Sequence, residues 1–324
     1  MKWRKYPALP FYWFRKGEHF VRRQIARIRQ KDDYFSRLRK EAECWRDGNH
    51  GNTWMDSRVI NELLTETISG DKSEYWLLYF KRKYVRECLD WALNLGCGTG
   101  DLEKNAFSIG MVRHFDSLDL SWSAMKKSGL LELRGVRCWV GDINTFEFEE
   151  EKYDVVFAVN ILHHIMVLER VLDGVRKALK PNGFLVLHEY TGPDRFQWSE
   201  EQLREVNIIL DRLPKKYKIN RRKKGMKKRI YRPLLDETNP NSPFEAVNSS
   251  KILPLVNSMF KRVEEVDLGG ALLHPLLEAI VENFDDDNPD DARLLQSLWE
   301  KERELMMRGV LRSDFTFGVY LRGE

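Results

Sequence analysis

Short apolar runs alternate with helical or turn-rich sequence between about residues 88 and 190. Runs of this length without a polar face are typical of parallel strands that are covered on both faces. Their alternation with helices predicts a parallel α/β sheet. The expected strands are Trp91–Leu95, Phe115–Leu120, Cys138–Val140, Val155–Val159 and Phe184–Leu187.

The same pattern predicts a linking helix and the last strands. Apolar residues recur at helical spacing from Met166 to Leu179, and Pro181-Asn182-Gly183 then forms a turn into the next strand. Two C-terminal strands complete a Rossmann-like, doubly wound sheet of seven mostly parallel strands. They are expected at Arg262–Leu268 and Phe315–Leu321, with helices at Leu272–Phe284 and Ala292–Met307.

The segments that flank this core have a different pattern. From Phe20 to Leu38, apolar residues recur at helical spacing between arginines, which predicts an amphipathic basic helix. After Tyr190 the sequence is polar and basic, which predicts an insertion or lid. We therefore expect a helical, aromatic-rich N-terminal extension (1–87), a core (88–190), the insertion (191–250) and the C-terminal part of the core (251–324).

The charge is distributed unevenly along the 324 residues. The composition, 42% hydrophobic and 32% charged, is typical of a folded globular protein, and the net charge is only +4. Residues 1–40 hold 13 Lys/Arg against 3 Asp/Glu, and residues 215–232 hold 11 Lys/Arg and no acid, so the remainder carries −17. Two such segments favour an anionic partner, with a solvated face as the alternative.

The sequence also indicates a compartment. The four cysteines have no CxxC spacing, which argues against a disulfide framework or a zinc knuckle and favours a reducing compartment. The aromatic stretch Tyr6–Phe14 is too short to cross a membrane. We therefore expect a cytoplasmic protein. Its basic, aromatic N-terminus could attach it peripherally to the inner membrane face or to a partner protein.

The first predicted strand runs into a glycine-rich loop, Gly96-Cys97-Gly98-Thr99-Gly100. Glycines allow the backbone to turn sharply and allow a ligand to approach main-chain atoms closely. The dinucleotide-binding fingerprint, Gly-x-Gly-x-x-Gly, is one residue longer. The loop therefore predicts a nucleotide-like ligand only in combination with its neighbours.

Polar residues follow the next strands at the edge where such sheets bind ligands. Asp119 ends the second strand, where a carboxylate can accept hydrogen bonds from two ribose hydroxyls. Asp142 and Ile143 follow the third strand and offer an acceptor for an exocyclic amine and an apolar contact for a purine. Asn160 follows the fourth strand.

Five ordered motifs within residues 88–190 resemble those of class I S-adenosylmethionine-dependent methyltransferases. They are Leu-Asn-Leu-Gly-Cys-Gly-Thr-Gly, Leu-Asp-Leu-Ser, Gly-Asp-Ile, Tyr-Asp-Val-Val-Phe and Leu-Lys-Pro-Asn-Gly-Phe-Leu. The resemblance implies that the three glycines approach the methionine and ribose parts of the cofactor, that Asp119 holds the ribose, and that Asp142 and Ile143 bind adenine. Asn94 stands where this family most often has an acidic residue. The implied cofactor set is Asn94, Gly96, Cys97, Gly98, Gly100, Asp119, Leu120, Asp142, Ile143 and Asn160.

Methyl transfer in this family is an in-line displacement that needs positioning and, for a hydroxyl acceptor, a base. Four candidates lie where strands four and five should end, and we rank them His164, His163, His188, Glu189. One of the two adjacent histidines is expected to pack against a helix, and periodicity leaves open which. We predict no metal site, because Asp154 lies inside a strand and Glu189 is isolated.

The stretch from His188 to Trp198 resembles bacterial methyltransferases that are encoded with glycosyltransferases of surface-glycan synthesis. It implies that the insertion is a substrate lid in which Arg195, Gln197 and Trp198 contact a sugar or phosphate, although Trp198 could simply pack the lid onto the sheet. Our best prediction is O-methyl transfer to a sugar or glycan. The basic segment 215–232 indicates that the acceptor, a small molecule or a glycan, is anionic, so Arg221 and Arg222 are added to the predicted substrate residues together with Tyr190.

Three other functions are considered. An RNA methyltransferase would use the basic segments to bind phosphates, but no RNA-binding module or Asn-Pro-Pro-Tyr-type motif is visible, so nucleic acid is the less favoured partner. A small-metabolite methyltransferase would keep the same core. A non-catalytic scaffold is disfavoured by the intact cofactor motifs.

Overall fold

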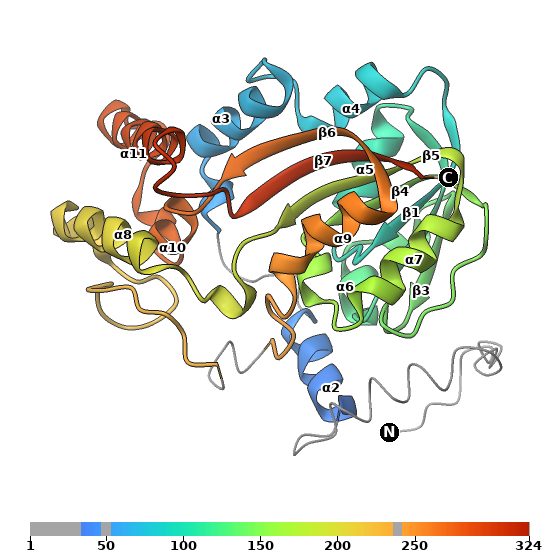
Figure 1. Cartoon of the computed structure of the whole chain (residues 1–324), viewed down its shortest axis with the longest axis horizontal. Helices are drawn as coiled ribbons and strands as arrows, with labels where there is room; N and C mark the ends of the chain where they lie inside the picture. The colour runs from blue at the N-terminus through green and yellow to red at the C-terminus, as the bar shows by residue number, and fades with distance from the viewer. Residues whose placement is uncertain (1–33, 47–52, 236–241, 324) are drawn as a thin grey trace.

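A seven-stranded sheet forms the centre of the computed structural model, which describes residues 34–46, 53–235 and 242–323 (Figure 1). The strand order is β3-β2-β1-β4-β5-β7-β6; β7 is antiparallel to both of its neighbours, and the other pairs are parallel. This confirms the predicted fold class and all seven strands. Their bounds are β1 Leu89–Leu95, β2 Val112–Asp119, β3 Val136–Val140, β4 Tyr153–Val159, β5 Leu179–Tyr190, β6 Phe260–Gly269 and β7 Phe315–Arg322.

The central strands carry mostly apolar side chains because helices cover both faces of the sheet. Alternate side chains along a strand point to opposite faces, so Val155 and Phe157 of β4 belong to one core and Val156 and Ala158 to the other. Helices α3 (Arg58–Ser69), α4 (Trp76–Tyr84), α5 (Asp101–Ser108) and α11 (Pro289–Met307) cover the first face. Helices α7 (Leu168–Ala178) and α9 (Ile252–Met259) cover the second.

The single helix predicted at Leu272–Phe284 is wrong. Helix α10 ends at Leu277, and only a short 3-10 turn, Val281–Asn283, follows. Ala279 between them has φ +62°, which a continuing helix cannot accommodate. The insertion supplies partners for the exposed helix end, because the Lys227 ammonium donates to the Glu278 carbonyl at 2.7 Å and the Arg221 amide to the Ala279 carbonyl at 2.8 Å. The break therefore depends on residues distant in sequence.

The flanking segments add helices at the edge of the sheet. Helix α2 (Tyr34–Cys44) contains the end of the predicted basic helix; the rest of that helix and the aromatic N-terminal segment lie outside the described residues. The insertion contains helix α8 (Glu200–Arg212), which lies beside α10 (Leu273–Leu277) and was not predicted. No helix among the described residues has the length and hydrophobicity needed to cross a membrane.

Candidate active site

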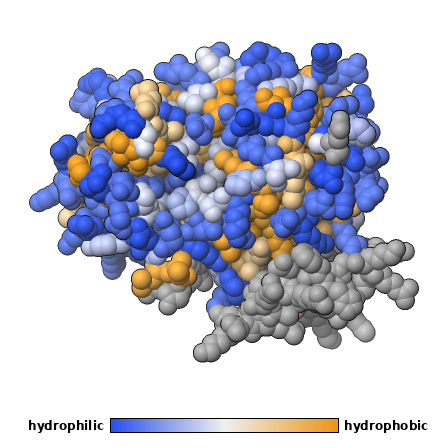
Figure 2. Space-filling view, viewed as in Figure 1, coloured by the Kyte–Doolittle hydropathy of each residue, from blue (hydrophilic) through white to orange (hydrophobic). Residues whose placement is uncertain are grey.

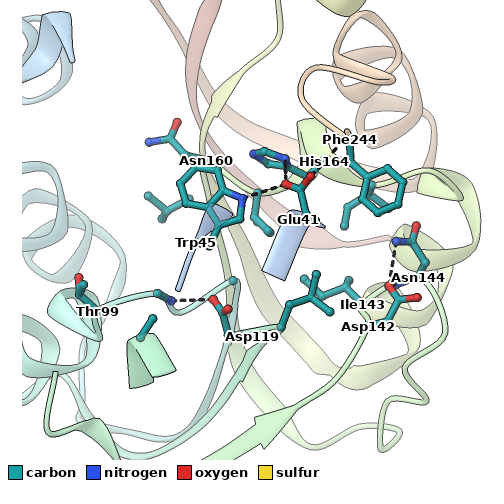
Figure 3. A pocket seen from close by; sticks show the side chains of 17 residues that line it. Glu41, Trp45, Thr99, Asp119, Asp142, Ile143, Asn144, Asn160, His164 and Phe244 are labelled. Carbon is teal, nitrogen blue, oxygen red and sulfur yellow. Dashed lines mark hydrogen bonds and ion pairs between the residues drawn. The ribbon is translucent and has the colours of Figure 1, made fainter. Parts of the chain in front are cut away.

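A cavity of about 270 Å³ lies at the carboxyl ends of β1, β2, β3 and β4 (Figure 3). This is the edge where open α/β sheets bind ligands. Seven predicted cofactor residues line it: Gly96, Gly98, Asp119, Leu120, Asp142, Ile143 and Asn160. Its other lining residues are Glu41, Trp45, Thr99, Ala124, Asn144, Val159, Ile161, His164, Ile165 and Phe244.

The glycine loop and Asp119 form one hydrogen-bonded unit. Gly96 has φ +67°, and a Cβ there would lie 2.6 Å from the Ile161 side chain, so only glycine fits. The Gly98 amide donates to Asp119 Oδ2 at 2.8 Å, and the Ser121 amide donates to Oδ1 at 2.7 Å. Burial raises the pKa of Asp119, although these amides oppose the shift. The carboxylate is thus held in place and can accept hydrogen bonds from ligand hydroxyls.

Asp142 lies across the cavity and is bonded to two different elements. Its Oδ1 accepts from the amide and the side chain of Asn144, both at 2.9 Å, and its Oδ2 accepts from the Tyr34 hydroxyl of α2 at 2.6 Å. Asn144 Oδ1 accepts in turn from the Met166 amide at 2.8 Å. Helix α2 therefore contacts the carboxylate that we expect to bind the adenine amine.

Helix α2 also brings a carboxylate to His164, the first-ranked base. Glu41 Oε1 lies 2.9 Å from His164 Nδ1, and it accepts from Trp45 Nε1 at 2.8 Å. Its Oε2 accepts from the Phe244 amide at 3.1 Å, so the carboxylate is fixed from three sides (Figure 3). Burial would raise the pKa of Glu41, but His164 and the hydrogen bonds outweigh burial and lower it. Glu41 is therefore ionised beside the imidazole.

His163 has a different environment from its neighbour. Its Nδ1 contacts Glu189 Oε1, and its Nε2 lies 3.4 Å from Glu245 Oε1. Burial would lower the pKa of His163, but the two carboxylates outweigh burial and raise it to about 10. Glu189 also accepts from the amides of Ile161 and Leu162, both at 2.7 Å. His163 is therefore protonated at neutral pH, and Glu189 holds the loop after β4.

His188 does not line this cavity. Its side chain points to the other face of β5, where its ring centroid lies 6.0 Å from that of Trp76 on α4. Burial lowers the pKa of His188 to about 4, so its imidazole is neutral. Of the four candidate bases, the structure places only His164 among the cavity-lining residues.

Three predicted cofactor residues support the loop from behind. The Asn94 amide group donates to buried Glu103 Oε1 at 2.9 Å, and Cys97 packs in a small core with Met125. Gly100 is the N-cap of α5 and has φ +69°. The backbone needs Gly100, but none of Asn94, Cys97 and Gly100 lines the cavity.

None of the six predicted substrate residues lines the cavity either. The Arg195 guanidinium donates to the carbonyls of Pro243 at 2.8 Å and Glu245 at 3.1 Å, so it holds the segment that carries Phe244. The other five have partners elsewhere: Tyr190 donates to Pro193 O, Gln197 to Pro233 O, Trp198 stacks on Phe196, the Arg221 amide donates to Ala279 O, and Arg222 pairs with Glu278.

Sequence reasoning missed Glu41, Trp45 and Phe244. They lie outside the methyltransferase motifs, and nothing in their own segments marks them as site residues. Glu41 and Glu245 bring carboxylates to the paired histidines, which the prediction of no metal site did not foresee. Potential ligand atoms of His163, His164 and Glu245 lie within 4.8 Å of one another. We interpret this cluster as ion-paired, because the His163 imidazolium lies between two carboxylates.

The fold is Rossmann-like, and the cavity offers the contacts that a nucleoside-containing ligand needs. The fixed Asp119 carboxylate suits ribose hydroxyls, and a Cβ on Gly98 would meet no protein atom within 4 Å, which leaves open space for a ligand there. Residues 93–187 match the family model described as "Methyltransferase domain". These residues therefore form a methyltransferase domain, and its cofactor is S-adenosylmethionine.

The sequence relatives match only part of this chain. Over 81 residues the chain is 33% identical to a sterol 24-C-methyltransferase of Clavispora lusitaniae, covering 24% of this chain and 22% of that protein. Over 115 residues it is 33% identical to a reducing polyketide synthase of Aspergillus oryzae, covering 32% of this chain and 5% of the synthase. The chain thus spans only a small part of the length of these relatives.

The solved structures that are similar cover more of the chain at lower identity. One is a phosphoethanolamine N-methyltransferase of Haemonchus contortus in complex with S-adenosylmethionine, 18% identical with a TM-score of 0.47, covering 82% of this chain and 57% of that chain. Another is an S-adenosylmethionine-dependent methyltransferase of Mesorhizobium loti, which is 16% identical with a TM-score of 0.43. The match covers 72% of this chain and 91% of that chain.

Replacing Asp119 should weaken cofactor binding. We expect Asp119→Ala to reduce S-adenosylmethionine affinity by roughly 1.5–3 kcal/mol, because charge-assisted hydrogen bonds to the ribose are lost. Calorimetric titration measures the affinity directly. Asp90→Ala, at an exposed position on β1, is the matched control and should bind like wild type. Unchanged affinity in Asp119→Ala would contradict this assignment of the ribose site.

Proposed function

We propose that this protein catalyses O-methyl transfer from S-adenosylmethionine to a hydroxyl group. The acceptor that we favour is a sugar hydroxyl of a small molecule or glycan. One observation carries the proposal: His164 lies in the same cavity as Asp119 and Asp142, with the Glu41 carboxylate 2.9 Å from its Nδ1. A base and a cofactor site in one cavity support deprotonation of an acceptor next to the methyl donor.

The proposed base acts through Nε2, the ring nitrogen that does not face Glu41. The carboxylate beside Nδ1 favours the tautomer with the proton on Nδ1, which leaves Nε2 to accept a proton from the acceptor hydroxyl. Glu41 then stabilises the imidazolium that forms. S-adenosylmethionine, when bound, supplies an electrophilic methyl group on its sulfonium. His163 is protonated already and cannot serve as this base.

The charge of the cavity bears on the acceptor. Three carboxylates line it, those of Glu41, Asp119 and Asp142, whereas no lysine or arginine is among the described lining residues. An uncharged hydroxyl-bearing group therefore suits the interior, and Trp45 and Phe244 offer aromatic surface to it. The anionic group that we expect on the acceptor, such as a phosphate, would lie outside the cavity.

Labelled S-adenosylmethionine and cell fractions provide the test. We expect label to enter a sugar-containing product as a methyl ether, and Asp119→Ala, with its weakened cofactor binding, to incorporate less label at limiting cofactor. Label in nucleic acid would contradict the proposal. The second candidate is methylation of a carbon atom in a small lipid or polyketide, which the similarity to a sterol 24-C-methyltransferase and a polyketide synthase favours. A C-methylated product would establish that alternative.

A further inference from the structure

A basic hairpin within the insertion has a defined conformation. Its two arms meet at an antiparallel bridge between Ile219 and Met226. The Asn220 amide donates to the Gly225 carbonyl at 3.0 Å, and Asn220 Oδ1 accepts from the Lys223 amide at 2.7 Å. The tip of the hairpin is therefore ordered although its side chains are exposed.

The hairpin is also attached firmly to the C-terminal helices. The Lys227 ammonium donates to the carbonyls of Pro275 and Glu278, both at 2.7 Å. Tyr217, just before the hairpin, stacks on Phe284 with ring centroids 4.4 Å apart. These contacts fix the direction in which the hairpin projects.

Most of the basic side chains here form no ion pair within the described residues. Of the eleven Lys and Arg at 215–232, three pair with acidic side chains of the described residues, namely Lys216, Arg222 and Arg232. Four exposed side chains make no ion pair with any part of the chain that the structure describes: Arg221, Lys223, Lys224 and Lys228. The positive charge therefore faces solvent.

Large apolar side chains lie exposed among these cations. The exposed fractions are 43% for Ile219, 44% for Met226, 70% for Tyr231 and 60% for Leu234. Ile219 and Met226 face each other across the bridge, so their side chains lie on one side of the hairpin. Figure 2 shows hydrophobic surface at the lower left of the molecule, below α8, where Figure 1 places the end of this segment.

We propose that residues 215–235, the basic segment, form a docking surface for an anionic lipid bilayer. Lysine and arginine attract anionic headgroups, while aliphatic and tyrosine side chains beside them enter the boundary between headgroups and acyl chains. Nucleic acid would engage the cations but provides no apolar phase for three aliphatic side chains. This inference depends neither on the acceptor nor on methyl transfer.

Sedimentation of the full chain with vesicles tests the proposal. We expect binding to an equal mixture of phosphatidylcholine and phosphatidylglycerol at low salt, weak binding to phosphatidylcholine alone, and release at about 1 M salt, where the Debye length is about 3 Å. The variant R221S/K223S/K224S/K228S should lose about 100-fold or more in partitioning, from the loss of four surface cations. The double variant M226S/L234S should weaken the vesicle binding that wild type retains at intermediate salt, because apolar contacts are not screened by salt.

A matched variant controls for net charge. R86S/R113S/R134S/K261S removes four exposed cations from other elements and should keep most of the binding. Cofactor affinity and circular dichroism show that each variant is folded. Wild-type binding by the first quadruple variant would assign the membrane contact to another segment and overturn the proposal. It would also be overturned if the apolar variant bound like wild type, or if RNA displaced the protein from vesicles at equal phosphate concentration.

Discussion

Replacing His164 by alanine should lower turnover by about 10²-fold or more while leaving S-adenosylmethionine affinity nearly unchanged. The reason is that His164 lines the cavity and is the proposed base, whereas Asp119 and Asp142 are the residues that we expect to hold the cofactor. Steady-state kinetics with the identified acceptor and calorimetry with the cofactor separate these two effects. Imidazole added in solution should restore part of the activity.

A matched histidine variant sharpens this test. His188→Gln changes a histidine that packs under Trp76 on the other face of the sheet, so it should retain turnover even if it loses some stability. Glu41→Gln, which removes the charge of a positioning residue, should lower kcat more than it changes KM. Full activity in His164→Ala would mean that the acceptor needs no deprotonation, and the proposed O-methyl transfer would be refuted.

The strands of this fold could be predicted because their faces are buried by nearby, regular elements. The alternation of side chains along β5 also indicates which face of the sheet each candidate base occupies. Leu185 and Leu187 belong to one core and Val186 to the other, so His188 shares the face of Val186. The assembled sheet shows which face borders the site. This knowledge is needed to exclude His188 from the candidate bases.

The partners of the histidines could not be predicted because they arrive from distant segments. Glu41 belongs to a helix that carries no methyltransferase motif, and Glu245 lies in a segment held by the Arg195 guanidinium. Both contacts are long-range and leave no periodic signal in the sequence. The same reason explains the break at Ala279, which depends on the hydrogen bonds that Lys227 and Arg221 make across the fold.

The second large effect is expected at Glu189, and it concerns stability. Glu189→Ala removes the partner of a buried imidazolium and leaves the amides of Ile161 and Leu162 without their acceptor. Breaking a buried ion pair from one side costs about 3–5 kcal/mol. Urea unfolding at neutral pH measures the loss. Glu149→Ala, on an exposed carboxylate, is the control and should change stability by less than about 1 kcal/mol.

The pH dependence of the unfolding free energy tests whether His163 is held as an imidazolium in the folded protein. Burial opposes the shift, but Glu189 and Glu245 raise its folded pKa to about 10, above the unfolded value of about 6.5. The folded state therefore binds the proton more tightly, so this contribution is complete below about pH 6.5 and is lost as the pH rises through about 10. In wild type, the unfolding free energy should decline across this window, and the decline should be smaller in His163→Gln. Equal slopes in both proteins would show that His163 is not held as an imidazolium, and the proposed division of roles between the adjacent histidines would fail.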